Sequence, residues 1–162
     1  MPKSSRFAVF GIGRYGHQIA LSLASKGAEV LTFDSDPARS EAIKDEVALA
    51  VTMDATDARA LHAQNVQDMD AAVVAIGENF EATMLTSMNL LDLGVPRVIV
   101  RSSGDHQKRI LTSLGIREIL TPESEVASIV SERLIHPNIG GFLELPDDYE
   151  IAEIHAPQNC IG

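Results

Sequence analysis

Three spaced glycines directly follow the first apolar run of the chain, and they constrain the fold more than any other feature. Residues 7–10 read Phe-Ala-Val-Phe, and Gly11, Gly13 and Gly16 come next. In such a triplet the first glycine permits a tight strand-to-helix turn, the second lets a phosphate approach bare backbone, and the third lets the helix pack closely on the sheet. The segment therefore predicts a strand, a turn and a helix whose first N–H groups bind an anion.

An acidic residue follows at the spacing that this turn requires. The second apolar run, residues 30–33, ends on Asp34, roughly 20 residues after the glycines. A carboxylate at this place accepts hydrogen bonds from a ribose diol and repels a 2′-phosphate. We therefore expect an adenine ribonucleotide with a free 2′-hydroxyl, which disfavours NADP. The alternative is a local role for Asp34 as a strand-end cap or turn former, since Ser35, Asp36 and Pro37 follow.

Composition narrows the class of protein. The 162 residues include 13 Lys and Arg against 23 Asp and Glu, a formal net charge of −10 that opposes binding to DNA or anionic lipid. Cys160 is the single cysteine and no apolar run approaches the ~18 residues of a membrane span. The five histidines lack zinc-ligand spacing, and no nucleophile motif is visible. We expect a cytoplasmic protein that is not an enzyme.

Short β-branched runs alternate with amphipathic helical patterns, which predicts right-handed βαβ units. The expected fold class is α/β, a Rossmann-like doubly wound parallel sheet with helices on both faces, plus the start of a second C-terminal module. Strands are predicted at Arg6–Phe10, Glu29–Asp34, Leu49–Met53, Ala71–Ile76, Arg97–Arg101 and Glu118–Leu120. Helices are predicted at Tyr15–Ser25, Pro37–Lys44, Asp57–Gln64, Asn79–Leu93, Gly104–Leu114 and Glu123–Leu134.

The sequence changes character after residue 136. We expect a nucleotide-binding domain at 1–136, and at 137–162 a hinge around 138–141 followed by two strands, Phe142–Leu145 and Glu150–Ile154. The last helix carries an apolar stripe that predicts a dimer contact, with packing on the chain's own sheet as the alternative. Its residues are Val126, Ile129, Val130 and Leu134.

Further candidates stand at the ends of predicted strands, where parallel α/β sheets bind nucleotides. Arg14 can reach terminal phosphates in a bidentate manner, or it is a solvated side chain. Asp54 and Thr56 lie where a base commonly binds, or they cap the next helix. Gly77 leaves room for a ligand or simply ends a strand, and Arg101 belongs to the site or to a surface ion pair. The full candidate set is Gly11, Ile12, Gly13, Arg14, Tyr15, Gly16, Asp34, Ser35, Asp54, Ala55, Thr56, Ala75, Ile76, Gly77, Asn79 and Arg101.

Taken together, these motifs resemble the regulator-of-potassium-conductance (RCK) domains, of the TrkA-N or KtrA type. The resemblance covers nearly the whole chain. Its most specific parts are Asp-Ala-Thr-Asp at 54–57 and the stretch at 110–123, Ile-Leu-x-x-Leu-Gly-Ile…Thr-Pro-Glu, which ordinary dehydrogenases lack. One departure is that the family continues into a complete C-terminal lobe, of which residues after Tyr149 look like only the first strand, so we expect a truncated chain.

The resemblance implies a cytosolic regulatory subunit that gates a membrane potassium-translocating partner of the Ktr or Trk type. It implies a homodimer, assembled into an octameric ring, whose shape changes as ATP and ADP exchange. Gly11, Gly13 and Gly16 would line the phosphate turn, with Arg14 on the terminal phosphates and Asp34 on the ribose. Glu123 would help hold a Mg²⁺ or Ca²⁺ ion near the phosphates.

Three alternatives stay open. An RCK regulator that senses NAD(H) uses the same turn and the same acidic residue, because both ligands carry an unmodified adenosine ribose. The cofactor half of a dehydrogenase is the second alternative, although no acid–base pair is visible near a nicotinamide position. The third is a structural adaptor that keeps the fold and binds no nucleotide.

Overall fold

The computed structural model describes residues 5–136 together with the backbone of residues 139–144 and 150–154. The chain divides into two compact units, residues 1–120 and 121–162. The first unit contains β1 (Arg6–Phe10), α1 (Arg14–Ser25), β2 (Glu29–Asp34), α2 (Pro37–Ile43), β3 (Leu49–Thr52), α3 (Ala58–Ala63), η1 (Val66–Asp68), β4 (Ala71–Val74), α4 (Phe80–Asp92), β5 (Val98–Arg101), α5 (Asp105–Ser113) and β6 (Glu118–Leu120). The second contains α6 (Pro122–Ile135), β7 (Ile139–Glu144) and β8 (Glu150–Ile154).

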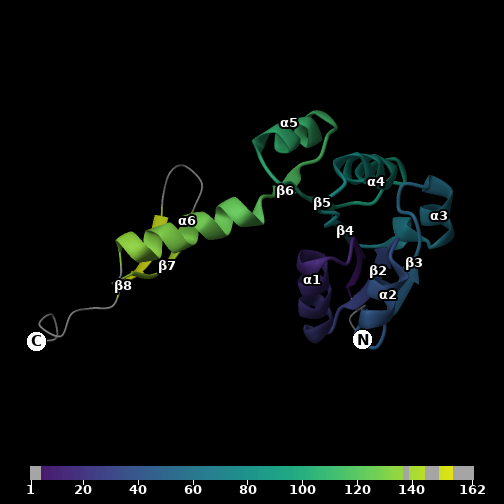
Figure 1. Ribbon diagram of the computed structural model, residues 1–162, viewed down its shortest axis with the longest axis horizontal. Helices are drawn as coiled ribbons and strands as arrows, with labels where there is room; N and C mark the ends of the chain where they lie inside the picture. Colours follow the sequence, from purple (N-terminus) through teal and green to yellow (C-terminus); the bar gives the residue numbers. More distant parts are fainter. Residues whose placement is uncertain (1–4, 137–138, 145–149, 155–162) are drawn as a thin grey trace, which may run out of the picture. The chain divides into compact units, whose positions relative to one another are not determined.

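A six-stranded parallel sheet forms the first unit, with the strand order β3-β2-β1-β4-β5-β6 (Figure 1). The chain moves outward from β1 to β3, then crosses over and builds the other half from β4 to β6. The carboxyl ends of β1 and β4 therefore flank the point where the direction reverses, which is where open α/β sheets bind ligands. This topology confirms the predicted Rossmann-like fold.

Alternating side chains of the central strands separate two apolar cores. Val9, Val30 and Val73 face the side that carries α1 and α2, together with buried Ala20 and Ile43 from those helices. The neighbours of these strand residues face the opposite side, where α3, α4 and α5 pack. That larger core includes Ala8, Phe10, Leu31, Phe33, Leu61, Ala72, Val74, Leu90, Val98, Val100 and Leu111. Helices thus cover both faces of the sheet, as a buried parallel sheet requires.

The predicted strand Ala71–Ile76 is too long. β4 ends at Val74, although the N–H of Ala75 still donates to the carbonyl of Phe10 at 2.7 Å. Beyond that bond the chain leaves the ladder and lies against the glycine turn. The short helix η1 was not predicted, and the other elements of this unit differ from their predicted ends by a few residues at most.

The second unit pairs β7 and β8 as antiparallel strands after α6. Ile139, Gly140 and Gly141, which were expected in a hinge, lie within β7, while Asn138 lies outside the described residues. The division into domains at 136 stays a prediction. On α6 the predicted stripe is exposed, from 48% at Val130 to 78% at Leu134.

Helix α1 starts close to the end of β1 because Gly16 has no side chain. A Cβ added at Gly16 would overlap the carbonyl oxygen of Gly11 and would lie 3.2 Å from the Cβ of Ala75. The oxygen belongs to backbone that β1 and β4 hold in place, so a rotamer change cannot relieve the overlap.

The variant Gly16→Ala is therefore expected to lower the free energy of unfolding by about 3 kcal/mol, as overpacking against fixed backbone does. Urea denaturation followed by circular dichroism measures the change. Gly104→Ala is the matched control, because a Cβ there meets no atom within 4 Å, and it should shift the value by less than about 0.5 kcal/mol. Similar losses in both variants would contradict this account of α1.

Candidate functional site

The glycine turn lies where the strand order reverses, packed against the segment that follows β4. Gly11 has φ +87°, a left-handed conformation that favours glycine. Its N–H donates to the carbonyl of Phe33 at 2.8 Å, and a Cβ there would lie 2.8 Å from the backbone nitrogen of Ile76. The end of β2 and the end of β4 thus hold the turn from two sides, which brings the predicted residues Ala75 and Ile76 to it.

Gly13 faces open space instead. A Cβ added there meets no atom within 4 Å, and Gly13 is the N-cap of α1 without a side-chain cap. The first turn of α1 contains no acidic residue either. The other α-helices of the described residues have a side-chain cap or an acidic residue in the first turn. The N–H groups and positive end of the α1 dipole therefore remain available to an anion.

Asp34 is buried beneath this turn, with 5% of its surface exposed. Its Oδ2 accepts the N–H of Ile12 at 2.6 Å, and its Oδ1 accepts the N–H of Asp36 at 2.8 Å. The turn-forming role weighed from the sequence is therefore present. Each oxygen has further lone-pair capacity, so binding of a ribose diol is compatible with this role and stays a prediction.

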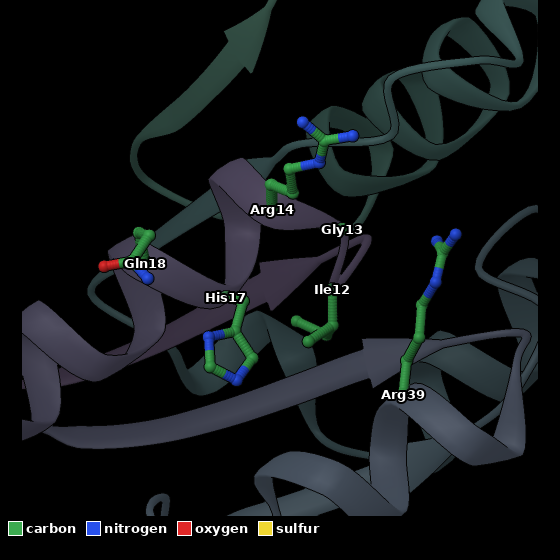
Figure 2. Close-up of a pocket in the computed structure, with 6 residues that line it drawn as sticks. All are labelled: Ile12, Gly13, Arg14, His17, Gln18 and Arg39. Carbon is green, nitrogen blue, oxygen red and sulfur yellow. The ribbon is translucent and has the colours of Figure 1, made fainter.

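A pocket of ≈ 610 Å³ opens between the starts of α1 and α2. Its lining comes from Ile12, Gly13, Arg14, His17, Gln18 and Arg39, and no acidic side chain is among these six residues. Figure 2 shows the side chains of Arg14 and Arg39 extending on either side of the turn formed by Ile12 and Gly13. Two guanidinium groups beside an uncapped helix start make this pocket suited to a phosphate-bearing ligand.

Three of these lining residues, His17, Gln18 and Arg39, are missing from the predicted set. The histidine was weighed only as a metal ligand. Arg39 is the third residue of α2, and α2 begins at the same sheet edge as α1. The predicted helix at 37–44 therefore places the arginine near this edge, whereas the reach of its side chain towards Asp34 is visible only in the structure. Its charge also stands near Asp34, with Nη1 3.6 Å from Oδ2 of that carboxylate.

The loop after β3 forms a self-contained turn. Asp54 accepts hydrogen bonds at Oδ1 from the hydroxyl of Thr56 at 2.7 Å and from its backbone N–H at 2.9 Å. Asp57, rather than Asp54 or Thr56, caps α3 by accepting the N–H of Arg59. The carbonyl of Thr56 accepts a hydrogen bond from Asn89 of α4 at 2.9 Å. The loop is thereby fixed at the carboxyl edge next to Asp34, since Met53 N–H donates to the Asp34 carbonyl.

Residues from α1, from the loop between β4 and α4, and from the end of β5 form a second group at this edge. The guanidinium of Arg101 lies over the ring of Tyr15, 5.7 Å from its centroid, close enough for a cation–π interaction. A Cβ added at Gly77 would lie 2.6 Å from Nη1 of Arg101. The small residue at 77 thus makes room for this arginine. Asn79 caps α4 by accepting the N–H of Ala82 at 3.0 Å.

The structure therefore places the glycine turn, Asp34 with Ser35, the 54–56 loop and the 75–79 loop at one edge of the sheet. Glu123 lies on α6, in the second compact unit. Within residues 5–136 and the described strands beyond, no group of three or more His, Cys, Asp or Glu is arranged to hold a metal ion. The metal role of Glu123 stays a prediction.

Hydrogen bonds from Thr56, first from its hydroxyl and then from its N–H, hold the pKa of the Asp54 carboxyl below its usual value. Because the folded pKa is the lower one, the stabilisation is present above the ordinary carboxyl pKa and is lost as the pH falls through the lowered value. Thr56→Val removes the hydroxyl donor and should raise the Asp54 pKa. A carbon-detected NMR titration of the carboxyl measures this.

Thr112→Val is the control for that titration, because the hydroxyl of Thr112 bonds within α5 to the carbonyl of Lys108. It should leave the Asp54 titration unchanged. An Asp54 midpoint that does not move in Thr56→Val would remove the hydroxyl as the cause.

Comparison with known proteins agrees with this architecture. A model of the TrkA-N domain family matches residues 7–122. The Ktr system potassium uptake protein C of Bacillus subtilis strain 168 is 32% identical over 156 residues, which cover 96% of this chain and 71% of that protein. Protein A of the same system and organism is 30% identical over 154 residues, covering 95% and 69%.

Solved structures share the fold at low identity. The TrkA-N domain of the Escherichia coli inner membrane protein ybaL has a TM-score of 0.71 and 15% identity, covering 84% of this chain and all of that one. GsuK bound to ADP has a TM-score of 0.69 and 21% identity, covering 82% and 34%. The GsuK channel bound to NAD has a TM-score of 0.67 and 13% identity, covering 90% and 26%.

None of the helices in the described part of the chain has the length and apolar character that crossing a membrane requires. The family match covers the glycine turn, Asp34, the 54–57 loop and the start of α6 in one continuous stretch. This chain belongs to the TrkA-N domain family.

Proposed function

We propose that this protein is a nucleotide-sensing regulatory subunit of a potassium uptake system. ATP or ADP binds at the glycine turn, and the resulting conformational change gates potassium flow through a membrane partner. The observation that carries the proposal is the pocket at the start of α1, where open Gly13, an uncapped helix and two arginines coincide. The named relatives, both potassium uptake proteins, support the choice of ion.

Each part of the pocket has a role in this proposal. The N–H groups at the start of α1 bind the phosphate chain, which approaches over Gly13. Arg14 contacts the terminal phosphate oxygens, because it lies on the exposed first turn of the helix. Asp34 accepts the ribose hydroxyl protons. An ATP–ADP exchange removes one phosphate and changes the contacts open to Arg14, which shifts the population between two conformations.

NAD(H) is the alternative ligand of the same site. The turn and Asp34 recognise an adenosine ribose and a pyrophosphate, and both ATP and NAD(H) contain these groups. Structures of the same fold exist with ADP and with NAD, each in GsuK. Arg14 favours ATP or ADP, since a terminal phosphate carries more charge for a guanidinium than an esterified pyrophosphate does.

Regulation of a membrane partner requires an assembly. We propose a homodimer, and an octameric ring of such dimers, that sits in the cytoplasm against the inner face of the membrane through the potassium-translocating subunit. The exposed stripe of α6 supports a contact between copies, because four apolar side chains at helical spacing are costly to leave in water.

A divalent cation, Mg²⁺ or Ca²⁺, completes the proposal. The Glu123 carboxylate fits such an ion chemically, since both metals prefer oxygen ligands. Glu123 shares the exposed first turn of α6 with Glu125. One carboxylate supplies only part of a coordination shell, so the remaining ligands would come from phosphates, water or a second subunit. When bound, the ion would offset the repulsion between Glu123 and a triphosphate.

A thermal-shift titration with ATP, ADP, NAD⁺, NADH and NADPH, each with and without Mg²⁺, tests the proposal in the wild-type chain and in Gly13→Ala. Binding to the folded state raises the melting temperature with ligand concentration. The added methyl in Gly13→Ala meets open space in the protein but stands where the phosphate approaches. We expect an unchanged melting temperature without ligand and a loss of about tenfold or more in apparent affinity.

The pattern of responses separates the readings. Stabilisation by ATP and ADP above the dinucleotides supports the proposal, whereas a preference for NADH replaces it with an NAD(H) sensor. A wild-type chain that no nucleotide stabilises would reject nucleotide sensing. Undiminished binding by Gly13→Ala would place the ligand elsewhere.

The metal role of Glu123 has its own variant. Glu123→Gln removes the charge and keeps the size, so the additional stabilisation that Mg²⁺ gives in the presence of ATP should fall, while the response to ATP alone should not. Glu132→Gln on the same helix is the control and should behave as wild type. A full Mg²⁺ effect in Glu123→Gln would exclude this residue from the metal site.

A further inference from the structure

Arg39 stands beside Asp34 in the pocket without a tight bond to it. Nη1 lies 3.6 Å from Oδ2 of Asp34, and Nε lies 3.7 Å from Oδ2 of Asp36. Both distances exceed that of a hydrogen bond. The side chain is 50% exposed, and it lines the pocket across the turn from Arg14 (Figure 2). Its N–H donors are therefore held near the carboxylate and remain available to a ligand.

Asp34 alone can pair with only one of the two hydrogen-bonding capacities of a hydroxyl group, the donor. An ionised carboxylate accepts hydrogen bonds and cannot donate them, whereas a hydroxyl both donates and accepts. Asp34 already accepts the N–H groups of Ile12 and Asp36, and what remains can take the proton of a ribose hydroxyl. The oxygen of that hydroxyl then needs a donor on the same side of the pocket. Arg39 is the donor that the pocket lining provides next to Asp34.

We propose that Arg39 is a specificity-determining residue that contacts the ribose 2′-hydroxyl of the bound nucleotide. Asp34 accepts the hydroxyl proton, and the Arg39 guanidinium donates to the hydroxyl oxygen. The two residues thus recognise the hydroxyl as a donor and as an acceptor, and they select ribonucleotides over 2′-deoxyribonucleotides. This inference rests on the nucleotide site proposed above and adds to it a residue and a selectivity.

A second arginine, Arg59, serves as a comparison, because it forms an ordinary ion pair at a helix start and lies away from the pocket. Arg59 follows the capping residue Asp57 of α3, much as Arg39 follows the capping residue Asp36 of α2. Its Nε lies 3.9 Å from Asp57, and its side chain is 96% exposed. Arg59 is not part of the pocket lining. The two arginines thus share their local setting and differ in their position relative to Asp34.

The test measures the dissociation constants of ADP and 2′-deoxy-ADP by isothermal titration calorimetry at fixed salt. It compares the full wild-type chain with Arg39→Gln, Arg39→Lys and Arg59→Gln. In wild type, loss of the hydroxyl should weaken binding about tenfold, as expected when two hydrogen-bonding partners lose it. In Arg39→Gln, ADP should bind about fivefold more weakly while 2′-deoxy-ADP changes by less than about twofold.

The decisive quantity is the dissociation constant of 2′-deoxy-ADP divided by that of ADP. It should fall in Arg39→Gln, fall less in Arg39→Lys, which keeps the charge but not the planar fork, and stay at the wild-type value in Arg59→Gln. A ratio that is unchanged in Arg39→Gln, or equal binding of both ligands by wild type, would overturn the role of Arg39 and leave nucleotide binding intact. Failure of wild type to bind ADP would overturn both.

Discussion

The site depends on the contact between α1 and the carbonyl of Gly11. Because Gly16 presents only hydrogen atoms to that oxygen, the helix can begin within a few residues of the end of β1. Its N–H groups then point over the edge of the sheet where the strand order reverses. A larger residue at position 16 would push the helix away from the sheet. The start of α1, with Arg14, would then no longer lie beside Arg39 and the buried carboxylate of Asp34.

The charged side chains that line the pocket are positive, whereas the protein as a whole is negative. The chain has a formal net charge of −10, yet the pocket beside Gly13 is lined by Arg14 and Arg39 and by no acidic residue among its six. Asp34, the nearby carboxylate, is largely withdrawn from solvent and surrounded by backbone N–H groups. An approaching anion therefore meets donors first, while the acidic surface elsewhere disfavours nonspecific binding to polyanions such as nucleic acid.

Much of this arrangement follows from the sequence, because glycine spacing and strand ends are local signals. The triplet at 11–16 and Asp34 predict the turn, and the alternation of strand and helix patterns predicts the parallel sheet. The ends of the predicted strands give the edge at which the candidate residues gather. The end of β4 was placed too late, since nothing in the apolar run at residues 72–76 shows that the chain leaves the ladder to pack on Gly11. Arg39 was missed because its importance depends on how far its side chain extends towards Asp34, which spacing along the chain does not reveal. The capping role of Asp57, in place of Asp54 or Thr56, was decided by competition among adjacent polar residues.

The hydrogen bond from the N–H of Ile12 to Asp34 joins the glycine turn to the end of β2, 22 residues away in the sequence. One carboxylate oxygen, Oδ2, thus holds the backbone of the glycine turn, and the same oxygen lies 3.6 Å from Nη1 of Arg39 on α2. Any group that binds this oxygen also alters its bond to the turn, and so adjusts the position of the N–H groups beyond it. Binding of the sugar and binding of the phosphate would then be coupled. A ligand that carries both groups would bind more tightly than the separate affinities of the two groups imply.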